Sequence, residues 1–579
     1  MVMATVFAGT WSEFDTSFLG RYYVDAWGTQ WFYWFTERVM LGGDDVAKTA
    51  VFFHPHGKDI YAHTGGNVLD ALIAIPFRAL FGRVVGYNLF ILVILATNAL
   101  AMRKLLGELK LSPAASWGAA VLFAFNPYTL TEIRDGRPTQ ALMLFALMFW
   151  VYWLRAGKHW KEAALAGIFL ALTGLTYWYY ALLMAPPAVI VFLLDRAPGS
   201  IRTRLVGAGL AALLVAPFAL GMVTAESVPG TFDASLWSAT TWSPKTVEGM
   251  SVGILSFDPI RRMSGFWIED TDGTRIFTPE WVSLCRVQYL FAVLGLLMGS
   301  RRTRIVGLAL IVPSLVIAIG PEWQGYPNTP YLLAVKASRV LQRLWWPGRA
   351  VMFLQVGLAV LAAASFDSLS RWPRTRLVAI AAGSVIWVVD LQVASLSPMG
   401  TWSASIPKVY ECLAKDTTRS AMFELPYGHS QAHLYYQTAH GLPIFGGMIE
   451  DNPIFTPVEQ QALRKENTFI KGLIKLADGE DLDEPILPEH KAAIGDLGYR
   501  WVLLDKIPYR TPGVYPGLKP MGKQIQLELA LGEMFGRPVY EDDDAALWAP
   551  WGGDSPCAEP SKKRKRRFRQ RERTSGGLP

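Results

Sequence analysis

The stretch RYYVDAWGTQWFYW (residues 21–34) holds a single carboxylate, Asp25, within a run of aromatic residues, and FFHPHG (52–57) follows it. A long series of apolar segments comes next in the chain. An acidic group in an aromatic helix ahead of such a series is typical of a residue held at the rim of a membrane, which makes Asp25 the candidate catalytic residue. The alternative is a surface helix whose Trp and Tyr side chains lie among lipid headgroups and whose carboxylate is only solvated.

The composition indicates a polytopic membrane protein. Of the 579 residues, 51% are hydrophobic and only 18% are charged, whereas about 25% are charged in soluble proteins. The net charge of +7 comes from a basic run at 562–573, which is typical of a disordered tail rather than of a nucleic-acid partner in such a chain. Cys285, Cys412 and Cys557 are far apart, which predicts neither a disulfide framework nor a zinc site.

About ten apolar segments approach the length that spans roughly 30 Å of hydrocarbon. Basic residues cluster in five alternate loops between them, so the positive-inside rule places those loops in the cytoplasm. The opposite loops are predicted to be exported, and their length indicates that the chemistry occurs on that face, although long loops can also lack a function. The expected spans are 86–102, 113–131, 139–154, 162–178, 181–194, 205–223, 284–298, 305–319, 350–366 and 377–393.

The amino-terminal part raises a question of topology. No signal peptide is visible, and residues 66–81 are predicted to lie along the membrane interface. Ten spans would leave the amino terminus outside, which predicts a further span ahead of this sequence or insertion of the aromatic stretch itself.

Periodicity changes after Val393, and the expected domain boundary follows at residue 396. Strands are expected at 420–425 and 500–505, a hairpin at 538–548, and helices at 406–415, 457–475 and 488–497. This pattern predicts an α/β domain behind a polytopic α-helical membrane domain. The expected division is a membrane domain 1–396 with exported loops 9–84, 132–138, 224–283 and 320–349, an exported domain 397–555, and a basic disordered tail 556–579.

This layout resembles the GT-C class of integral-membrane glycosyltransferases. An acidic residue in the first exported loop lies beside the membrane in that class, and Asp25 occupies the matching place. The segments that resemble a bacterial branch of the class are DAWGTQWFYW (25–34), FFHPHGKDIYAH (52–63), GYNLF (86–90), FAFNPYTLTEIRDGRPTQ (123–140), FELPYG (423–428), YYQTAHGLPIFGG (435–447) and LGYRWVLLD (497–505).

The resemblance implies transfer of a sugar from a polyprenyl-phosphate carrier to a glycan, lipid or protein acceptor in the cell envelope. It implies a bacterial inner (cytoplasmic) membrane location, with the C-terminal domain outside the cytoplasm. Asp25 would be the general base, and arginines would clamp the phosphate. The candidate substrate-binding residues are His54, His56, Glu132, Arg134, Asp135 and Arg349.

Several alternatives remain open from the sequence. Arg349 can instead anchor the next span, and Glu132 and Asp135 can be solvated. No cofactor is expected, and a divalent metal held by His54, His56 and His63 is not favoured. A non-enzymatic glycolipid-handling or transport protein is the second interpretation, although transporters place ionisable residues inside spans and show repeats. An assembly factor acting through the C-terminal domain is the third.

Overall fold

The structure is a computed structural model that describes residues 5–45, 47–60, 68–156, 159–194, 201–224, 268–269, 275–276, 286–320, 322–323, 326–337, 347–371, 373–393, 396–428, 431–448, 456–482, 484–510, 522–553 and 556–557. It divides into two compact units. The membrane unit comprises Met1–Arg21 and Tyr61–Ala404, and the C-terminal unit comprises Tyr22–Ile60 and Ser405–Pro579. His63, most of the predicted loop 224–283 and the basic tail from residue 558 lie outside the described residues.

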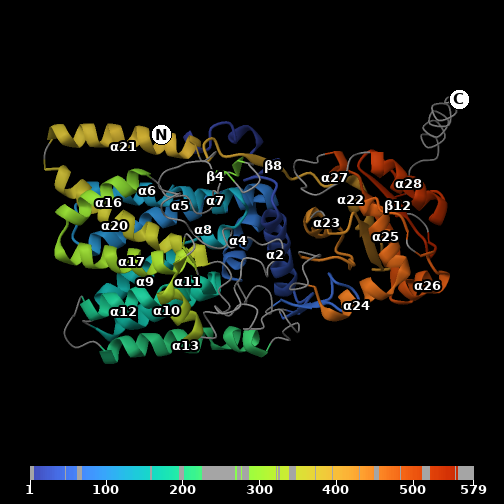
Figure 1. Cartoon of the computed structure of the whole chain (residues 1–579), viewed down its shortest axis with the longest axis horizontal. Coiled ribbons are helices and arrows are strands. Elements are labelled where there is room, and N and C mark those ends of the chain that lie inside the picture. The colour runs from blue at the N-terminus through green and yellow to red at the C-terminus, as the bar shows by residue number, and fades with distance from the viewer. Residues whose placement is uncertain are drawn as a thin grey trace. The chain divides into compact units, whose positions relative to one another are not determined.

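The membrane unit is helical (Figure 1). Its helices are η1 (Trp11–Glu13), α4 (Leu69–Phe81), α5 (Arg83–Glu108), α6 (Pro113–Ala124), α7 (Pro127–Arg134), α8 (Pro138–Ala141), α9 (Leu144–Arg155), α10 (Trp160–Thr176), α11 (Trp178–Leu183), α12 (Ala185–Leu194), α13 (Ile201–Thr224), α16 (Arg286–Met298), α17 (Arg301–Ile319), α18 (Thr329–Ala337), η3 (Pro347–Ala350), α20 (Val351–Leu369) and α21 (Pro373–Val393). Its short strands are β1 (Ser17–Leu19), β4 (Ile268–Glu269), β5 (Arg275–Ile276), β6 (Glu322–Trp323), β7 (Tyr326–Pro327) and β8 (Thr401–Ser403).

Helix α20 is the centre of the membrane unit. Its residues 351–365 are all buried, as expected for a helix that is apolar on every side. Helices α6, α16 and α17 pack around it, and these helices run side by side in Figure 1. In the described part of the chain, four helical segments are long and apolar enough to cross a membrane: Arg83–Glu108, Ile201–Gly221, Arg301–Ile319 and Pro347–Leu369. The protein is therefore membrane-embedded.

Glycines set how closely these helices pack. A side-chain carbon added to Gly295 of α16 would overlap the carbonyl oxygen of Leu361 in α20. One added to Gly167 of α10 would overlap the carbonyl oxygen of Gly207 in α13. Small residues that let helix backbones touch are typical of helix pairs in membranes, where packing rather than water exclusion drives association.

All ten expected spans fall on helices, but some of them are broken. The segment expected at 113–131 is divided between α6 and α7 because the Asn126 side chain caps a new helix and Pro127 occupies its first turn. The segment expected at 139–154 is divided between α8 and α9. There, Asn98 of α5 donates to the carbonyl oxygen of Ala141 at 2.7 Å and accepts from the backbone N–H of Met143 at 2.8 Å. An amide that satisfies both groups makes a helix break tolerable in an apolar setting.

The C-terminal unit is an α/β domain with a four-stranded sheet of order β11-β12-β10-β9. Strand β10 pairs with β9 in parallel and with β12 antiparallel, and β11 pairs antiparallel with β12. Its strands are β2 (Lys48–Thr49), β3 (Lys58–Asp59), β9 (Ala421–Leu425), β10 (Tyr499–Asp505), β11 (Tyr540–Glu541) and β12 (Ala545–Trp548). Its helices are α2 (Val24–Met40), α22 (Lys408–Leu413), α23 (Ala432–His440), α24 (Val458–Glu466), α25 (Thr468–Asp478), α26 (Pro488–Asp496), α27 (Ile507–Arg510) and α28 (Gly522–Phe535).

The elements expected in the C-terminal region are present, with one correction. The helix expected at 457–475 is two helices, α24 and α25, because the Asn467 side chain accepts from the backbone N–H of Ile470 and starts a second helix.

The early aromatic stretch belongs to the C-terminal unit. Helix α2 packs against α23, and Trp31 Nε1 donates to Gln437 Oε1 at 2.6 Å. The chain around Phe53 pairs with the segment before α24, where the Phe53 N–H donates to the Gly446 carbonyl oxygen at 2.8 Å. The sequence-based boundaries instead assign this stretch to an exported loop of the membrane domain.

Candidate functional site

A polar turn between α7 and α8 supplies most of the site in the membrane unit. Asn126 starts α7 by accepting from the Thr129 N–H at 3.0 Å, and α7 ends at Arg134. Gly136 then reverses the chain with φ +75°, a conformation that suits glycine, before α8 begins. The charged residues of the motif EIRDGR (132–137) are thereby placed on one short turn.

An ionic network, here called the arginine cluster, joins this turn to the chain near β1. Asp135 Oδ1 accepts from Arg21 Nε at 2.8 Å and from Arg134 Nε at 3.2 Å, and Asp135 Oδ2 accepts from Arg137 Nη2 at 3.1 Å. Arg137 Nε also donates to Glu132 Oε2. Both carboxylates are 1% exposed, so the arginine contacts replace the water that they would otherwise need.

The backbone also brings Arg21 to the turn. Its N–H donates to the Arg134 carbonyl oxygen at 2.8 Å. Gly20, with φ +125°, precedes it, and a side-chain carbon there would lie 2.6 Å from the same oxygen. Arg21 keeps 45% of its side chain exposed, so this arginine connects the buried network to the surface of the unit.

Arg349 lies beside the arginine cluster, in η3 at the start of α20. Its guanidinium carbon is 5.2 Å from the centre of the Tyr177 ring, a cation–π contact. Glu132 and Arg137 both act electrostatically on it. With Arg349, four arginines lie around Glu132 and Asp135.

Tyrosines and a second polar contact complete the surroundings. Tyr180 donates its hydroxyl hydrogen to the Gln140 carbonyl oxygen at 2.7 Å, and the Tyr128 hydroxyl oxygen lies 3.5 Å from that of Tyr180. Thr139 of α8 donates to Asp70 of α4 at 2.8 Å. The turn is therefore held on both sides by side chains from other helices.

The chemistry available here is anion binding rather than proton abstraction. The oxygens of Glu132 and Asp135 already accept hydrogen bonds from guanidinium groups, which makes them poor general bases. Guanidinium groups are planar donors that match phosphate oxygens. These arginines are therefore the candidates for holding a phosphate at the edge of the cluster.

Asp25 lies in the C-terminal unit, in the first turn of α2, and its side chain is half-buried. The amino-terminal turn of a helix favours a negatively charged side chain. The sequence-predicted residues thus fall into two groups. Glu132, Arg134, Asp135 and Arg349 come together in the membrane unit, whereas Asp25, His54 and His56 belong to the C-terminal unit.

The two histidines lie where the early stretch meets the C-terminal sheet. His54 Nε2 is 2.8 Å from the Leu497 carbonyl oxygen, and the His54 carbonyl oxygen accepts from Gln460 and Tyr499. Partial burial lowers the pKa of His56. His54 therefore has a structural role, and substrate binding by His54 or His56 stays a prediction.

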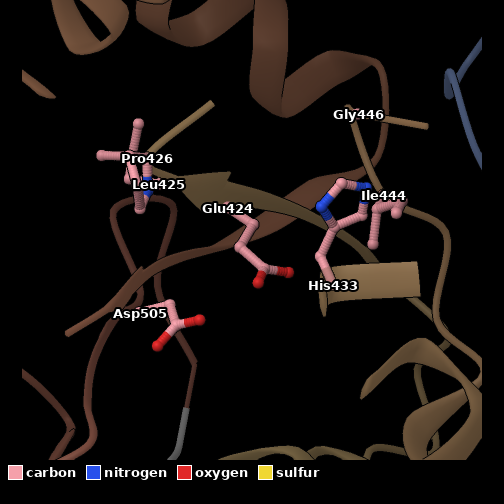
Figure 2. A pocket seen from close by; sticks show the side chains of 7 residues that line it. All are labelled: Glu424, Leu425, Pro426, His433, Ile444, Gly446 and Asp505. Carbon is pink, nitrogen blue, oxygen red and sulfur yellow. The ribbon is translucent and has the colours of Figure 1, made fainter. Parts of the chain in front are cut away.

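A pocket that the sequence analysis did not identify lies at the carboxyl ends of β9 and β10 (Figure 2). Glu424 pairs with Leu503, so Asp505, two residues further on, projects from the same face of the sheet. His433 of α23 also lines the pocket. Burial raises the pKa of Asp505 to about 7. Ligands commonly bind beyond the carboxyl ends of parallel strands, and that rule could have indicated this place from the two predicted strands.

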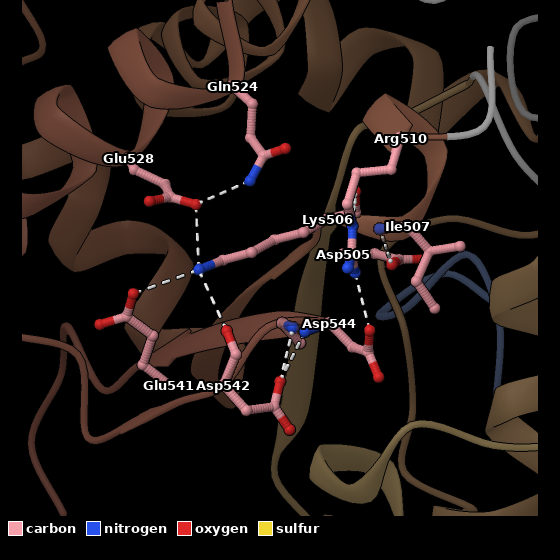
Figure 3. Close-up of polar contacts among 10 residues, drawn as sticks. Asp505, Lys506, Ile507, Arg510, Gln524, Glu528, Glu541, Asp542 and Asp544 are labelled. Carbon is pink, nitrogen blue, oxygen red and sulfur yellow. Dashed lines mark hydrogen bonds and ion pairs between the residues drawn. The ribbon is translucent and has the colours of Figure 1, made fainter. Parts of the chain in front are cut away.

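A second ionic network, here called the lysine cluster, lies in the C-terminal unit (Figure 3). Lys506 Nζ is 3.0 Å from Glu528 Oε1, 3.2 Å from Glu541 Oε1 and 3.4 Å from the Asp542 carbonyl oxygen. An ammonium group has three hydrogens to donate, and these three oxygens can accept them all. The side chain of Lys506 is 3% exposed, which indicates a structural role.

No protein-family model matches the sequence, and no curated protein matches it either. Solved structures do. The arabinofuranosyltransferase AftD from Mycobacteria superimposes with a TM-score of 0.55 at 15% identity, over 93% of this chain and 38% of that one. This chain therefore spans well under half the length of AftD.

Two further solved structures are more distant in shape. The oligosaccharyltransferase of Archaeoglobus fulgidus, tethered with an acceptor peptide, gives a TM-score of 0.48 at 14% identity over 92% of this chain and 69% of that one. ArnT from Cupriavidus metallidurans, bound to undecaprenyl phosphate, gives a TM-score of 0.37 at 11% identity over 95% of this chain and 96% of that one. The fold rests on the first of the three: this chain shares the fold of AftD, and the predicted helical membrane architecture with a C-terminal α/β domain is confirmed.

Proposed function

We propose that the protein is a membrane glycosyltransferase that moves a sugar from a polyprenyl-phosphate carrier to an acceptor on the exported face. The observation that carries this proposal is the group of four arginines around the turn between α7 and α8, in a unit of apolar helices. A lipid phosphate has a charged head and an apolar tail, and this setting suits both. The likeness of the fold to AftD supports the same assignment.

In the proposed reaction the bond between the anomeric carbon and the phosphate oxygen breaks as the acceptor oxygen bonds to that carbon. Negative charge develops on the departing polyprenyl phosphate, and Arg349 with the arginine cluster would stabilise it. Asp25 would take the proton of the acceptor hydroxyl. The product is the glycosylated acceptor, and polyprenyl phosphate leaves as the anion.

The proposal includes a location. The C-terminal unit, with Asp25, would lie outside the cytoplasm in a bacterial inner membrane, and the acceptor would be a glycan, a lipid or a protein. The five basic loops that alternate along the sequence support this orientation.

Arg349→Gln tests the phosphate-binding role. We expect the affinity of the detergent-solubilised protein for polyprenyl phosphate to fall roughly 10- to 100-fold, since a hydrogen bond to a charged group is worth about 1.5–3 kcal/mol. Native mass spectrometry or a thermal-shift titration measures it. The matched control is Arg286→Gln, because Arg286 also begins a membrane helix but pairs with Asp390 at 3.3 Å. Equal affinities in wild type and Arg349→Gln would remove the basis of the proposal.

Transfer itself is measured with membranes and a radiolabelled polyprenyl-phosphate sugar, following the label into product. The same arginines could hold a glycolipid in a non-enzymatic handling protein, which is the second candidate. That protein would bind the labelled donor and release it intact. An enzyme would transfer the label to an acceptor, and this transfer would stop when the protein is removed from the membranes. A carrier would give no labelled acceptor.

A further inference from the structure

Two of the three cysteines meet in the C-terminal unit although 144 residues separate them in the sequence. Cys412 is the fifth residue of α22 (Lys408–Leu413) and is half-buried, and Cys557 is 6% exposed. The two side chains are in hydrogen-bonding contact. Cys557 Sγ also lies 3.9 Å from the carbonyl oxygen of Val409, three residues before Cys412 in the same helix.

The backbone holds both thiols in place. Helix α22 packs on β12 and buries Val409 and Leu413 beneath it. Cys557 follows the end of β12, Trp548, by nine residues. Tyr540 of β11 is near enough to both thiols to act on them electrostatically. Helix α22 and the chain that follows β12 therefore bring the two sulfur atoms together.

We propose that Cys412 and Cys557 form a disulfide bond in the mature protein. This inference rests on the proposed location of the C-terminal unit outside the cytoplasm, because disulfides form and persist in oxidising compartments. The S–S distance of a disulfide is about 2 Å, so two thiols already in contact need only a small side-chain movement.

The oxidant is a disulfide-bearing thiol oxidase or small-molecule disulfide. Cys412, the more exposed thiol, loses its proton and attacks that disulfide, which expels one thiolate and leaves a mixed disulfide. Cys557 then loses its proton and attacks Cys412 Sγ, which expels the second thiolate. The two cysteines lose two protons and two electrons in total, and the oxidant takes these up and leaves as two thiols.

The bond would have a structural consequence. It would close a loop of more than 100 residues that contains β9, β10 and β12, and closing long loops restricts the unfolded chain most strongly. It would also fix the chain directly before the basic tail to α22. The C-terminal unit should accordingly resist denaturant better when oxidised.

Peptide mapping tests the proposal. The full chain is extracted from membranes in N-ethylmaleimide without reductant, digested and examined by mass spectrometry. We expect a linked pair of peptides containing Cys412 and Cys557, two hydrogens lighter than the free thiols, while Cys285 is alkylated. Alkylation of both Cys412 and Cys557 would overturn the proposal. Sugar transfer is assayed on the same membranes, so absence of the bond and absence of transfer are separate results.

Variants provide a second readout. Cys412→Ser, Cys557→Ser and the double variant should lower the urea midpoint of the C-terminal unit equally, and dithiothreitol should lower that of the wild type to the same value. Cys285→Ser is the matched control and should keep the wild-type midpoint. Two separate packing contacts would instead give additive losses in the double variant and no response of the wild type to dithiothreitol, which contradicts a bond.

Discussion

The arginine cluster of the membrane unit and the lysine cluster of the C-terminal unit are both buried ionic networks, but their charge balance is opposite. Two carboxylates meet three arginines in the first, with Arg349 beside them. A single ammonium meets two carboxylates in the second, and those carboxylates keep 20% and 24% of their side chains exposed.

This difference separates the proposed binding site from a structural contact. Lys506 has one acceptor for each of its hydrogens, and its partners reach water, so the network needs nothing further. In the arginine cluster three guanidinium groups surround two carboxylates that are 1% exposed, and Arg21 reaches the surface, where an anion can approach. We therefore propose a binding role for the arginine cluster and not for the lysine cluster.

The largest expected effect is on Asp25. Asp25→Asn keeps the size of the side chain but cannot accept a proton, so transfer should fall by about 10²- to 10⁴-fold. The radiolabel assay measures it, with polyprenyl-phosphate binding as a second readout that should stay at the wild-type value. Glu37→Gln, on the same helix α2, is the control. Near-normal transfer by Asp25→Asn would exclude this carboxylate as the base.

Removal of Arg137 tests the arginine cluster as a folded structure. Arg137→Gln leaves Glu132 buried beside a neutral amide, and loss of one partner of a buried pair typically costs about 3–5 kcal/mol. Thermal unfolding in detergent should show this loss. The double variant Glu132→Gln with Arg137→Gln should recover part of it, because no uncompensated carboxylate remains at position 132. A double variant less stable than Arg137→Gln would contradict this account.

The equivalent change in the lysine cluster should be milder. Lys506→Met leaves two carboxylates that water can still reach, so we expect a loss of about 1–3 kcal/mol. Transfer per folded molecule should be unchanged. If Lys506→Met proved more destabilising than Arg137→Gln, the exposure of the partner carboxylates would not explain the difference in stability between the two clusters.

The smallest effect concerns pH and Asp505. Its pKa is raised from 3.8 to about 7, so the folded state holds this proton more tightly than the unfolded state between those values. The contribution of Asp505 to the free energy of unfolding is therefore complete below about pH 4 and is lost as the pH rises to 7. Urea unfolding of wild type and Asp505→Asn from pH 4.5 to 8 should show a difference that changes by at least about 1 kcal/mol, the equivalent of one pKa unit.

Burial of His440 has the opposite effect on how stability depends on pH, because it lowers the pKa of that side chain to about 3. Stability from His440 therefore rises between about pH 3 and 6.5. Only the comparison with Asp505→Asn isolates the carboxyl group, and a difference that is independent of pH would show that Asp505 titrates normally.

The sequence predicted much of this architecture because apolar periodicity is a local signal. Within the described residues every expected span falls on one helix or on two consecutive helices, and the strands at 421–425 and 499–505 lie within a residue or so of their expected bounds. Glu132, Arg134 and Asp135 were predicted together since they share one short motif. The break at Asn126 was readable in principle, because Asn followed by Pro is a strong helix start.

The remaining features depend on contacts between distant parts of the chain. Arg21 meets Asp135 across 114 positions, and nothing near either residue specifies its partner. The same holds for Cys412 with Cys557, whose spacing alone indicated unrelated cysteines. The assignment of Tyr22–Ile60 to the C-terminal unit was also missed, because the run of aromatic residues in α2 is equally typical of a membrane interface.

The discontinuous C-terminal unit sets a timing problem during protein synthesis. Its first segment, Tyr22–Ile60, leaves the ribosome before roughly 340 residues of the membrane unit, which at about 5–20 residues per second takes some 20–70 s. Throughout that interval the buried side of α2, with Trp31 at its centre, has no α23 to cover it and no Gln437 to accept from its indole. A nascent chain arrested before residue 405 should therefore bind holding chaperones through this aromatic segment, and release them once α23 has been made.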